Sequence, residues 1–163
     1  MELYVTEYLL PCLWAFCASV GFGPVYNIHG KGILICGAGG ALGWLVYLLG
    51  LHWLGNDLLS AFVAAMAIGL FSEAMARIRR CPVTGYLQVA LLPLVPGAGI
   101  YDSMRYCVAG EMDLFLAKLV HTLGMAAALS VGAMLVSALV RTATTARQER
   151  KVQTAVLMDD ETK

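Results

Sequence analysis

The sequence predicts an all-α membrane protein, a bundle of about five transmembrane helices. Two observations support this fold class. First, 60% of the 163 residues are hydrophobic and 13% are charged, with a mean hydropathy of +0.74, whereas soluble domains are usually about 45–50% apolar and about 25% charged. Second, five stretches approach the roughly 20 apolar residues that a helix needs to cross a bilayer. We therefore expect lipid to cover the excess apolar surface.

The expected spans, in order, are about 5–22, 32–54, 58–76, 86–108 and 114–140. Pro11 predicts a kink in the first span, and the fourth is interrupted between Pro93 and Gly99. The leader is acidic, which favours a retained helix over a signal peptide. Residues 1–140 thus form the predicted transmembrane domain. Residues 141–163 are a polar tail, for which a frayed helix and disorder both remain open.

Basic residues predict the orientation of the bundle. They fall in the first and third connections and after the last span: Lys31, Arg77, Arg79, Arg80, Arg141, Arg147, Arg150 and Lys151. Five crossings place these regions on one side, which the positive-inside rule predicts to be the cytoplasm. The opposite side collects acids: Glu2, Glu7, Asp57, Glu111 and Asp113. We therefore expect the N-terminus outside and the C-terminus in the cytoplasm.

The fourth span carries the most informative motif. Pro93 and Pro96 each remove a backbone donor, and unpaired backbone groups at membrane depth must face protein or a water-filled cavity. A second half-helix starting near Gly97 to Gly99 would present free N–H groups and a positive dipole end to a carboxylate. The candidate substrate-binding residues of this region are Pro96, Gly97, Gly99, Tyr101, Asp102 and Ser103. A plain proline kink or a loop at the membrane surface is the competing interpretation.

Three further polar groups lie in or near the spans. Asp102 is three residues before Arg105, so a local ion pair is expected, either at depth or at the outer interface. Glu73 and Arg77 have the favourable i,i+4 order, which predicts an interfacial pair or, alternatively, an ion or proton relay. His121 lies inside the fifth span and can either hydrogen-bond between helices or carry a proton.

Small residues repeat every four positions and predict the faces on which the helices pack. The stripes are Gly39–Gly43 on the second span, Ala61–Ala65–Gly69 on the third and Gly124–Ala128–Gly132 on the fifth. The glycine-rich run 37–43 has neither the Walker lysine nor the Rossmann spacing, so a nucleotide loop is not expected.

Several classes of function are not indicated. The five cysteines form no CxxC pair and the three histidines are scattered, so no metal site, disulfide framework or cofactor is expected. The net charge is zero, which gives no sign of nucleic acid as a partner. We find no nucleophile–base pair, so the chain is not expected to be an enzyme.

The sequence also resembles a known family. Tyr26–Asn27, the glycine-rich run 37–43, and Pro93-Leu-Val-Pro-Gly97 followed by Tyr101 resemble the threonine/serine exporter family, in particular its small five-helix component, over residues 15–140. The resemblance implies a multi-pass protein of the bacterial inner (plasma) membrane. Some members carry both halves in one chain of about ten helices. In others a larger subunit, with a cytoplasmic region and about five helices, pairs with a small subunit like this one, so the resemblance implies such a partner. Threonine and serine are the implied substrates, with dicarboxylates such as succinate for some two-subunit members.

The resulting hypothesis is a subunit of a secondary exporter of small carboxylate-bearing metabolites. The backbone from Pro96 to Gly99 would bind the carboxylate, while Tyr101 and Ser103 hydrogen-bond the substrate. Asp102 would hold an ammonium or a coupling proton, and Asn27 would orient a neighbouring carbonyl. A dicarboxylate does not suit Asp102 unless this group is protonated or faces elsewhere. A non-transporting scaffold or assembly subunit, and a homo-oligomer, remain alternatives.

Overall fold

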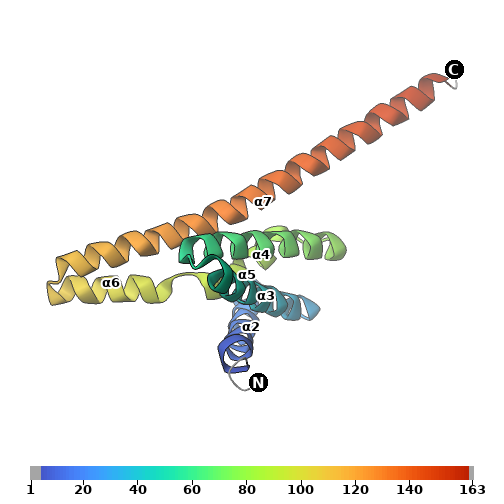
Figure 1. The fold of residues 1–163 in the computed structure, drawn as a ribbon. Helices are drawn as coiled ribbons and strands as arrows, with labels where there is room; N and C mark the ends of the chain where they lie inside the picture. The colour runs from blue at the N-terminus through green and yellow to red at the C-terminus, as the bar shows by residue number, and fades with distance from the viewer. Residues whose placement is uncertain (1–4, 162–163) are drawn as a thin grey trace.

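The computed structural model describes the backbone of residues 5–161 and the side chains of residues 6–146. Two predictions fall outside these ranges: the interpretation of the leader 1–4 and the side chains of Arg147, Arg150 and Lys151. The described chain is helical throughout and contains no strand (Figure 1). Its elements are η1 Val5–Leu9, α2 Leu10–Phe22, η2 Gly23–Tyr26, α3 Lys31–Leu54, α4 Asp57–Arg79, α5 Val83–Leu91, η3 Leu92–Leu94, α6 Gly97–Ala109 and α7 Met112–Glu161.

The predicted fold class is confirmed. Four helices are long and apolar enough to cross a membrane, at Thr6–Tyr26, Lys31–Leu54, Asp57–Arg79 and Met112–Ala146. The pair Val83–Leu94 and Gly97–Ala109 passes the same test together, with a bend of 48° at the break, and brings the number of spans to five if the two halves are counted as one broken span. At Pro11 the expected disturbance takes the form of a π-helical turn, Val5–Leu9, directly before α2. The missing N–H of proline leaves a carbonyl of that turn without its α-helical partner.

The connection between α3 and α4 shows how local sequence fixes the antiparallel hairpin. Gly55 ends α3 in the left-handed conformation, with φ at 61°, which costs glycine little. The side chain of Asn56 then accepts hydrogen bonds from the amides of Leu58 and Leu59, at 3.0 and 3.4 Å. This N-cap satisfies two of the otherwise unpaired donors at the start of α4.

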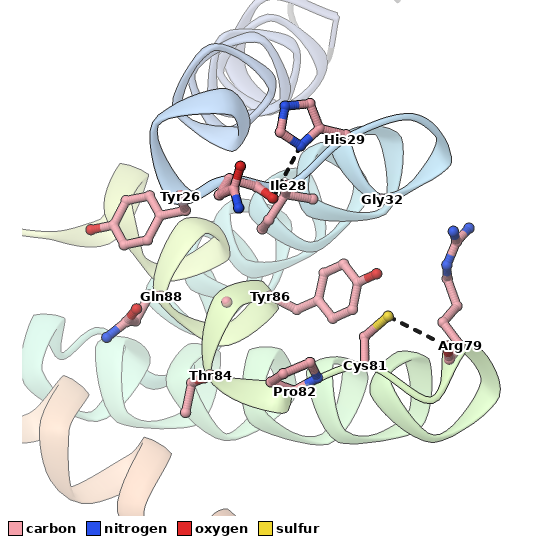
Figure 2. Close-up of a pocket in the computed structure, with 12 residues that line it drawn as sticks. Tyr26, Ile28, His29, Gly32, Arg79, Cys81, Pro82, Thr84, Tyr86 and Gln88 are labelled. Atoms are coloured by element: carbon pink, nitrogen blue, oxygen red, sulfur yellow. Dashed lines mark hydrogen bonds between the residues drawn. The ribbon is translucent and has the colours of Figure 1, made fainter.

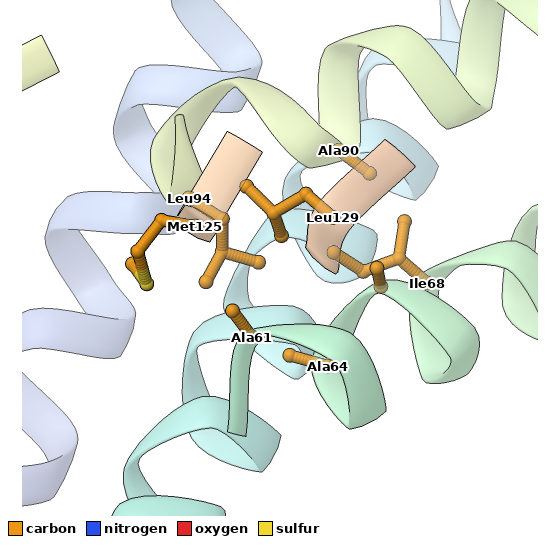
Figure 3. Packing of buried hydrophobic residues seen from close by; sticks show 8 residues of the cluster. Ala61, Ala64, Ile68, Ala90, Leu94, Met125 and Leu129 are labelled. Carbon is orange, nitrogen blue, oxygen red and sulfur yellow. The ribbon is translucent and has the colours of Figure 1, made fainter. Parts of the chain in front are cut away.

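Glycines of α3 let three helices approach its backbone. Gly37 and Gly40 face Phe16 and Ser19 of α2, while Gly39 faces Ala90 of α5 and Phe71 of α4. Gly43 faces Ile68 of α4 and Leu94 at the end of η3. The side chains around Ile68 form the main apolar cluster, to which α4, α5, η3 and α7 all contribute (Figure 3). Helix association of this kind in lipid relies on close van der Waals packing.

Helix α7 runs parallel to α4, because successive residues of one meet successive residues of the other. Gly124 faces Leu58, Gly132 faces the carbonyl of Phe62, and Gly69 faces Val136. Beyond this contact α7 leaves the bundle and its backbone stays helical to Glu161 (Figure 1). Most of the predicted tail is therefore a continuation of α7.

The two ends of the bundle differ in charge. The connections α2–α3 and α4–α5 carry Lys31, Arg79 and Arg80, and we call this the basic end. The connections α3–α4 and α6–α7 carry Asp57, Glu111 and Asp113, and we call this the acidic end. Among the described elements, α6 packs extensively against α7, and the two extend together away from α2–α5 (Figure 1).

Candidate functional site

The break in the fourth span lies halfway along the bundle. Leu94, the last residue before the break, is buried and contacts Gly43. Gly43 is near the middle of α3 (Lys31–Leu54), and its other neighbour, Ile68, is near the middle of α4 (Asp57–Arg79). A bilayer that encloses α3 and α4 therefore places Leu94 near its midplane. The first turn of α6 lies nearer the acidic end, because Gly99 meets Thr122 of α7, and the neighbouring His121 and Gly124 meet Asp57 and Leu58 at the start of α4.

Protein groups satisfy much of the backbone that the two prolines leave unpaired. The missing N–H of Pro93 frees the carbonyl of Val89, and the buried Ser19 of α2 donates to this oxygen at 3.4 Å. The amide of Val95 donates to Leu92 at 3.2 Å. Pro96 has φ −77° and ψ 59°, an inverse γ-turn, which the amide of Gly97 closes by donating to Val95 at 2.7 Å. The break is thus a defined turn rather than a frayed segment.

The N-terminus of α6 begins directly after this turn. No side chain caps it, and among the described backbone hydrogen bonds none is donated by Ala98 or Gly99 to a carbonyl outside the helix. Nothing lies within 4 Å of a Cβ built on Gly97, so the first turn is open on that side, whereas Gly99 is pressed against Thr122 of α7. Free N–H groups and the dipole give this terminus a partial positive charge.

The side chains that follow do not converge on one point. Tyr101 is 69% exposed, whereas Ser103 is buried and donates to the carbonyl of Gly99 at 2.7 Å. Asp102 pairs with Lys118 of α7, with 3.6 Å between Oδ2 and Nζ. The expected pair with Arg105 is absent from the described ion pairs, because Lys118 reaches Asp102 from across the hairpin and Arg105 lies over the ring of Tyr106, at 5.3 Å.

A polar cluster at the acidic end links three helices. The hydroxyl of Tyr47 in α3 donates to Asp57 Oδ1 of α4 at 2.8 Å, and His121 Nε2 of α7 lies 3.5 Å from Asp57 Oδ2. His121 is one turn after Lys118 on α7, so the two side-chain pairs are neighbours along this helix. Sequence reasoning singled out His121 but missed Tyr47, because nothing in the sequence shows that their helices meet at Asp57.

The other predicted site residues lie elsewhere. Glu73 pairs with Arg77 at 3.8 Å, near the basic end of α4. Asn27 takes the left-handed conformation at the end of η2, and its carbonyl lies 3.1 Å from Nδ1 of His29. Asn27 borders a cavity beside the start of α5, about 16 Å along the bundle from the break by the length of the span Val83–Leu94. The predicted substrate-binding residues therefore lie in two separate parts of the bundle: Asn27 beside this cavity, and the others at or after the break.

A second, apolar cavity of about 400 Å³ borders the break. It is lined by residues of α2, by Trp44 of α3 and by Pro93. The indole nitrogen of Trp44 is buried without a hydrogen-bond partner among the described residues. This residue is a further candidate that the sequence did not suggest, because its position beside Pro93 depends on how α3 packs.

Comparisons with known proteins place the chain in a family. An uncharacterized protein of Haemophilus influenzae is 25% identical over 104 residues, which cover 64% of this chain and 35% of that protein. The chain thus spans about a third of the length of this curated relative. No solved structure matches the chain. The family model described as "Threonine/Serine exporter, ThrE" matches residues 11–139, which include the break and most of every span. The chain therefore belongs to the threonine/serine exporter family, a family of membrane transporters.

Proposed function

We propose that the chain is one subunit of a secondary exporter of small carboxylate-bearing metabolites, with threonine and serine as the leading substrates. Family membership supports transport of this kind. The single observation that carries the site is the break itself, which starts at mid-depth with Leu94 and leaves the first turn of α6 open toward the acidic end. Many secondary transporters bind substrate where a helix is broken near the midplane.

In this proposal the open first turn of α6 binds the substrate carboxylate through the amides of Ala98 and Gly99. Asp102, in the second turn, receives the ammonium group or a coupling proton when Lys118 releases it. Ser103 uses its proton for the carbonyl of Gly99, so it can only accept a hydrogen bond from the substrate. Glu73 and His121, in ion-pair contact with Arg77 and Asp57, are the candidates for an ion or proton relay.

The exposed apolar side chains of the hairpin formed by α6 and the start of α7 support a partner subunit. Val108 is 90% exposed, Tyr101 69%, Val120 67% and Met104 60%, and uncovered apolar surfaces of this extent mark contacts with lipid or protein. We propose that a larger membrane subunit of the same family, with five helices and a cytoplasmic region, covers this hairpin. A second copy of the chain is the alternative, and the native mass of the complex distinguishes the two.

One observation favours succinate-like dicarboxylates as a second candidate substrate class. Lys118 balances the charge of Asp102, so a dianion that approaches α6 does not meet an uncompensated acid. The objection raised by the sequence, that a dicarboxylate does not suit Asp102, is therefore weakened.

Export of labelled threonine, serine and succinate from loaded cells, with and without the chain, tests the proposal. We expect Gly97→Leu and Asp102→Asn to reduce export at least several-fold, because they block the open turn of α6 and remove its acid. Gly21→Leu is the matched control, since a Cβ on Gly21 likewise has nothing within 4 Å but lies on α2, far from the break. Equal export by Gly97→Leu, Asp102→Asn and wild type, at equal protein levels, would rule out the first turn of α6 as the binding site.

The scaffold alternative predicts a different pattern. Deletion of the chain would then lower the amount of its partner, while the site variants export normally. The two cases are separated by raising the partner to its normal level in cells that lack the chain. Export should recover if the chain is only a scaffold, and it should stay low if the chain is a transport subunit.

Native cysteines test the proposed orientation, with the N-terminus outside and the C-terminus in the cytoplasm of a bacterial plasma membrane. Cys81 is exposed at the basic end, and Cys107 is partly exposed in the hairpin near the acidic end. In variants that keep only one of these thiols, we expect an impermeant maleimide to label Cys107 on intact cells. Cys81 should react only after permeabilisation, and the reverse pattern would invert the topology.

A further inference from the structure

A polar cavity at the basic end has no role in the mechanism above. It has a volume of about 430 Å³ and lies between the α2–α3 connection, the α4–α5 connection and the first turns of α3 and α5 (Figure 2). This volume is within the range of small-molecule sites. The cavity is about 16 Å from the break by helical rise, so it is a separate place in the molecule.

The lining of the cavity carries positive charge and no acid. No Asp or Glu lines it, and its polar side chains belong to Tyr26, Asn27, His29, Arg79, Thr84, Tyr86 and Gln88. Arg79 has no ion-pair partner among the described side chains, whereas Arg77, two residues earlier on the same helix, pairs with Glu73. Arg79 is an exposed residue at the rim of the cavity, so its guanidinium has no counter-ion among the described side chains, and a bound anion would supply one.

The buried Tyr86 shapes this cavity. The residue is 5% exposed, and its ring lies between Ile28 and the connection that carries Cys81 (Figure 2). Its hydroxyl is 3.3 Å from the position that a Cβ on Gly32 would occupy, and the same Cβ would lie 2.8 Å from Ile28. Glycine at position 32 thus allows a phenolic hydroxyl to stand beside the first turn of α3. A larger side chain would fill this part of the cavity.

Two helices begin at the cavity wall. Neither α3 nor α5 has a side-chain cap at its N-terminus, so the dipoles of both helices place partial positive charge at this end of the bundle. In α3 the amides of Gly32 and Ile33 already donate to the carbonyls of His29 and Gly30. Together with Arg79 and the tyrosine hydroxyl, these groups match the requirements of a carboxylate, which accepts several hydrogen bonds and carries one negative charge.

We propose that the basic-end cavity is a second binding site, which takes the carboxylate of a small metabolite before it reaches the break. The role of this loading site in export rests on the proposed function, but binding itself does not. The guanidinium of Arg79 pairs with the carboxylate, and Tyr86 and the amides of the adjoining connections provide further donors. On the predicted orientation, the cavity faces the cytoplasm, from which an exporter takes its substrate.

Direct binding to the purified full-length chain tests this site. The chain is placed in nanodiscs of zwitterionic lipid and titrated with labelled L-threonine, with succinate, and with threoninol, which lacks the carboxylate. We expect saturable binding of threonine or succinate and at least about tenfold weaker binding of threoninol, since charge-assisted hydrogen bonds are the strong ones. The relative affinities of threonine and succinate identify the source of the carboxylate.

Arg79→Gln and Arg77→Gln form the matched pair of variants. We expect Arg79→Gln to weaken carboxylate binding about tenfold or more, Arg79→Lys to restore part of it, and Arg77→Gln to change it less than twofold. Gly32→Ala, which crowds Ile28 and Tyr86, should weaken binding in a protein whose thermal unfolding shows that it is folded. No saturable binding to the wild-type chain, equal binding of threoninol, or equal effects of the two arginine variants would overturn the proposal. The same titration in nanodiscs that contain anionic lipid would also overturn it, if only the lipid headgroups occupied the cavity.

The export assay separates the failure of this inference from failure of the proposed function. If cells export threonine, serine and succinate equally well without the chain, but Arg79-dependent binding persists, the loading site stands and the exporter role falls. If export requires the chain, but Arg79→Gln binds and exports like wild type, the exporter role stands and the loading site falls.

Discussion

The centre of the bundle and the α6–α7 hairpin (residues 97–120) consist of similar apolar helices but are held in different ways. In the centre, Ile68 and Ala64 are fully buried, and glycines bring backbones into contact. In the hairpin, Val108 and Tyr101 are largely exposed, and its two helices meet at Gly99 and Thr122 and are joined by one side-chain ion pair, Asp102–Lys118. The centre is thus completed within the chain, whereas the hairpin needs lipid or a partner to cover it.

The largest expected loss of stability is in the centre of the bundle, where Gly132 of α7 contacts α4. A Cβ on Gly132 would lie 2.7 Å from the carbonyl oxygen of Phe62 and 3.0 Å from Ala65. A carbonyl of the α4 backbone cannot rotate away, so Gly132→Val must push α7 off α4. We expect a loss of about 3 kcal/mol of unfolding free energy, as overpacked cores show, measured by denaturant titration of the purified chain in detergent.

Gly97→Val is the control in the hairpin, because nothing lies within 4 Å of its Cβ position. It should change the unfolding free energy by no more than about 1 kcal/mol. Similar losses of unfolding free energy for Gly132→Val and Gly97→Val would show that position 97 in the hairpin is packed as tightly as the centre, contrary to the difference described above.

A smaller effect concerns the contact between α2 and α5, where Ser19 donates to the carbonyl of Val89 that Pro93 leaves free. Ser19→Ala should cost about 1 kcal/mol, the usual net value of one hydrogen bond. Pro93→Ala supplies an N–H for the same carbonyl, so in this background Ser19→Ala should cost much less. An unchanged cost in both backgrounds would mean that Ser19 does not compensate for the proline.

The spans and the break were predictable because each depends on residues close in sequence. An apolar run of the right length predicts a span, and Pro93 and Pro96 predict a discontinuity wherever the helix lies. The half-helix that starts at Gly97 is confirmed for the same reason. Likewise, the i,i+4 pair of Glu73 and Arg77 needs only a helix to form.

The partners across helices were not predictable. Asp102 was expected to pair with Arg105, but which cation reaches it depends on the register of α6 against α7. Tyr47 meets Asp57 because the α3–α4 turn is short, and His121 joins them only because α7 runs parallel to α4. Asn27 and the residues of the break were predicted to form one site, because the sequence gives no distance between them.

The polar cluster at the acidic end tests how the hairpin is tied to the centre. Tyr47→Phe and Asp57→Asn should each cost roughly 1 kcal/mol, and a double-mutant cycle should show a coupling of about 0.5–1 kcal/mol. The cycle of Asp57→Asn with His121→Gln should give a smaller coupling, because the 3.5 Å pair is nearly half exposed. A larger coupling for Asp57 with His121 than for Asp57 with Tyr47 would make His121 the stronger partner of Asp57.

The smallest effect on stability belongs to Lys118, yet it is informative about function. The Asp102–Lys118 pair is more than a third exposed on both sides, so Lys118→Gln should change the unfolding free energy by no more than about 0.5 kcal/mol. Without Lys118 the charge of Asp102 is uncompensated and repels a dianion more than a zwitterion. The ratio of succinate to threonine export should therefore fall several-fold, and the double variant Lys118→Gln, Asp102→Asn should restore it. Lys118→Arg, which keeps the charge, should leave the ratio unchanged. A ratio that is the same in all four proteins would place Asp102 outside the substrate path, even if the break itself binds substrate.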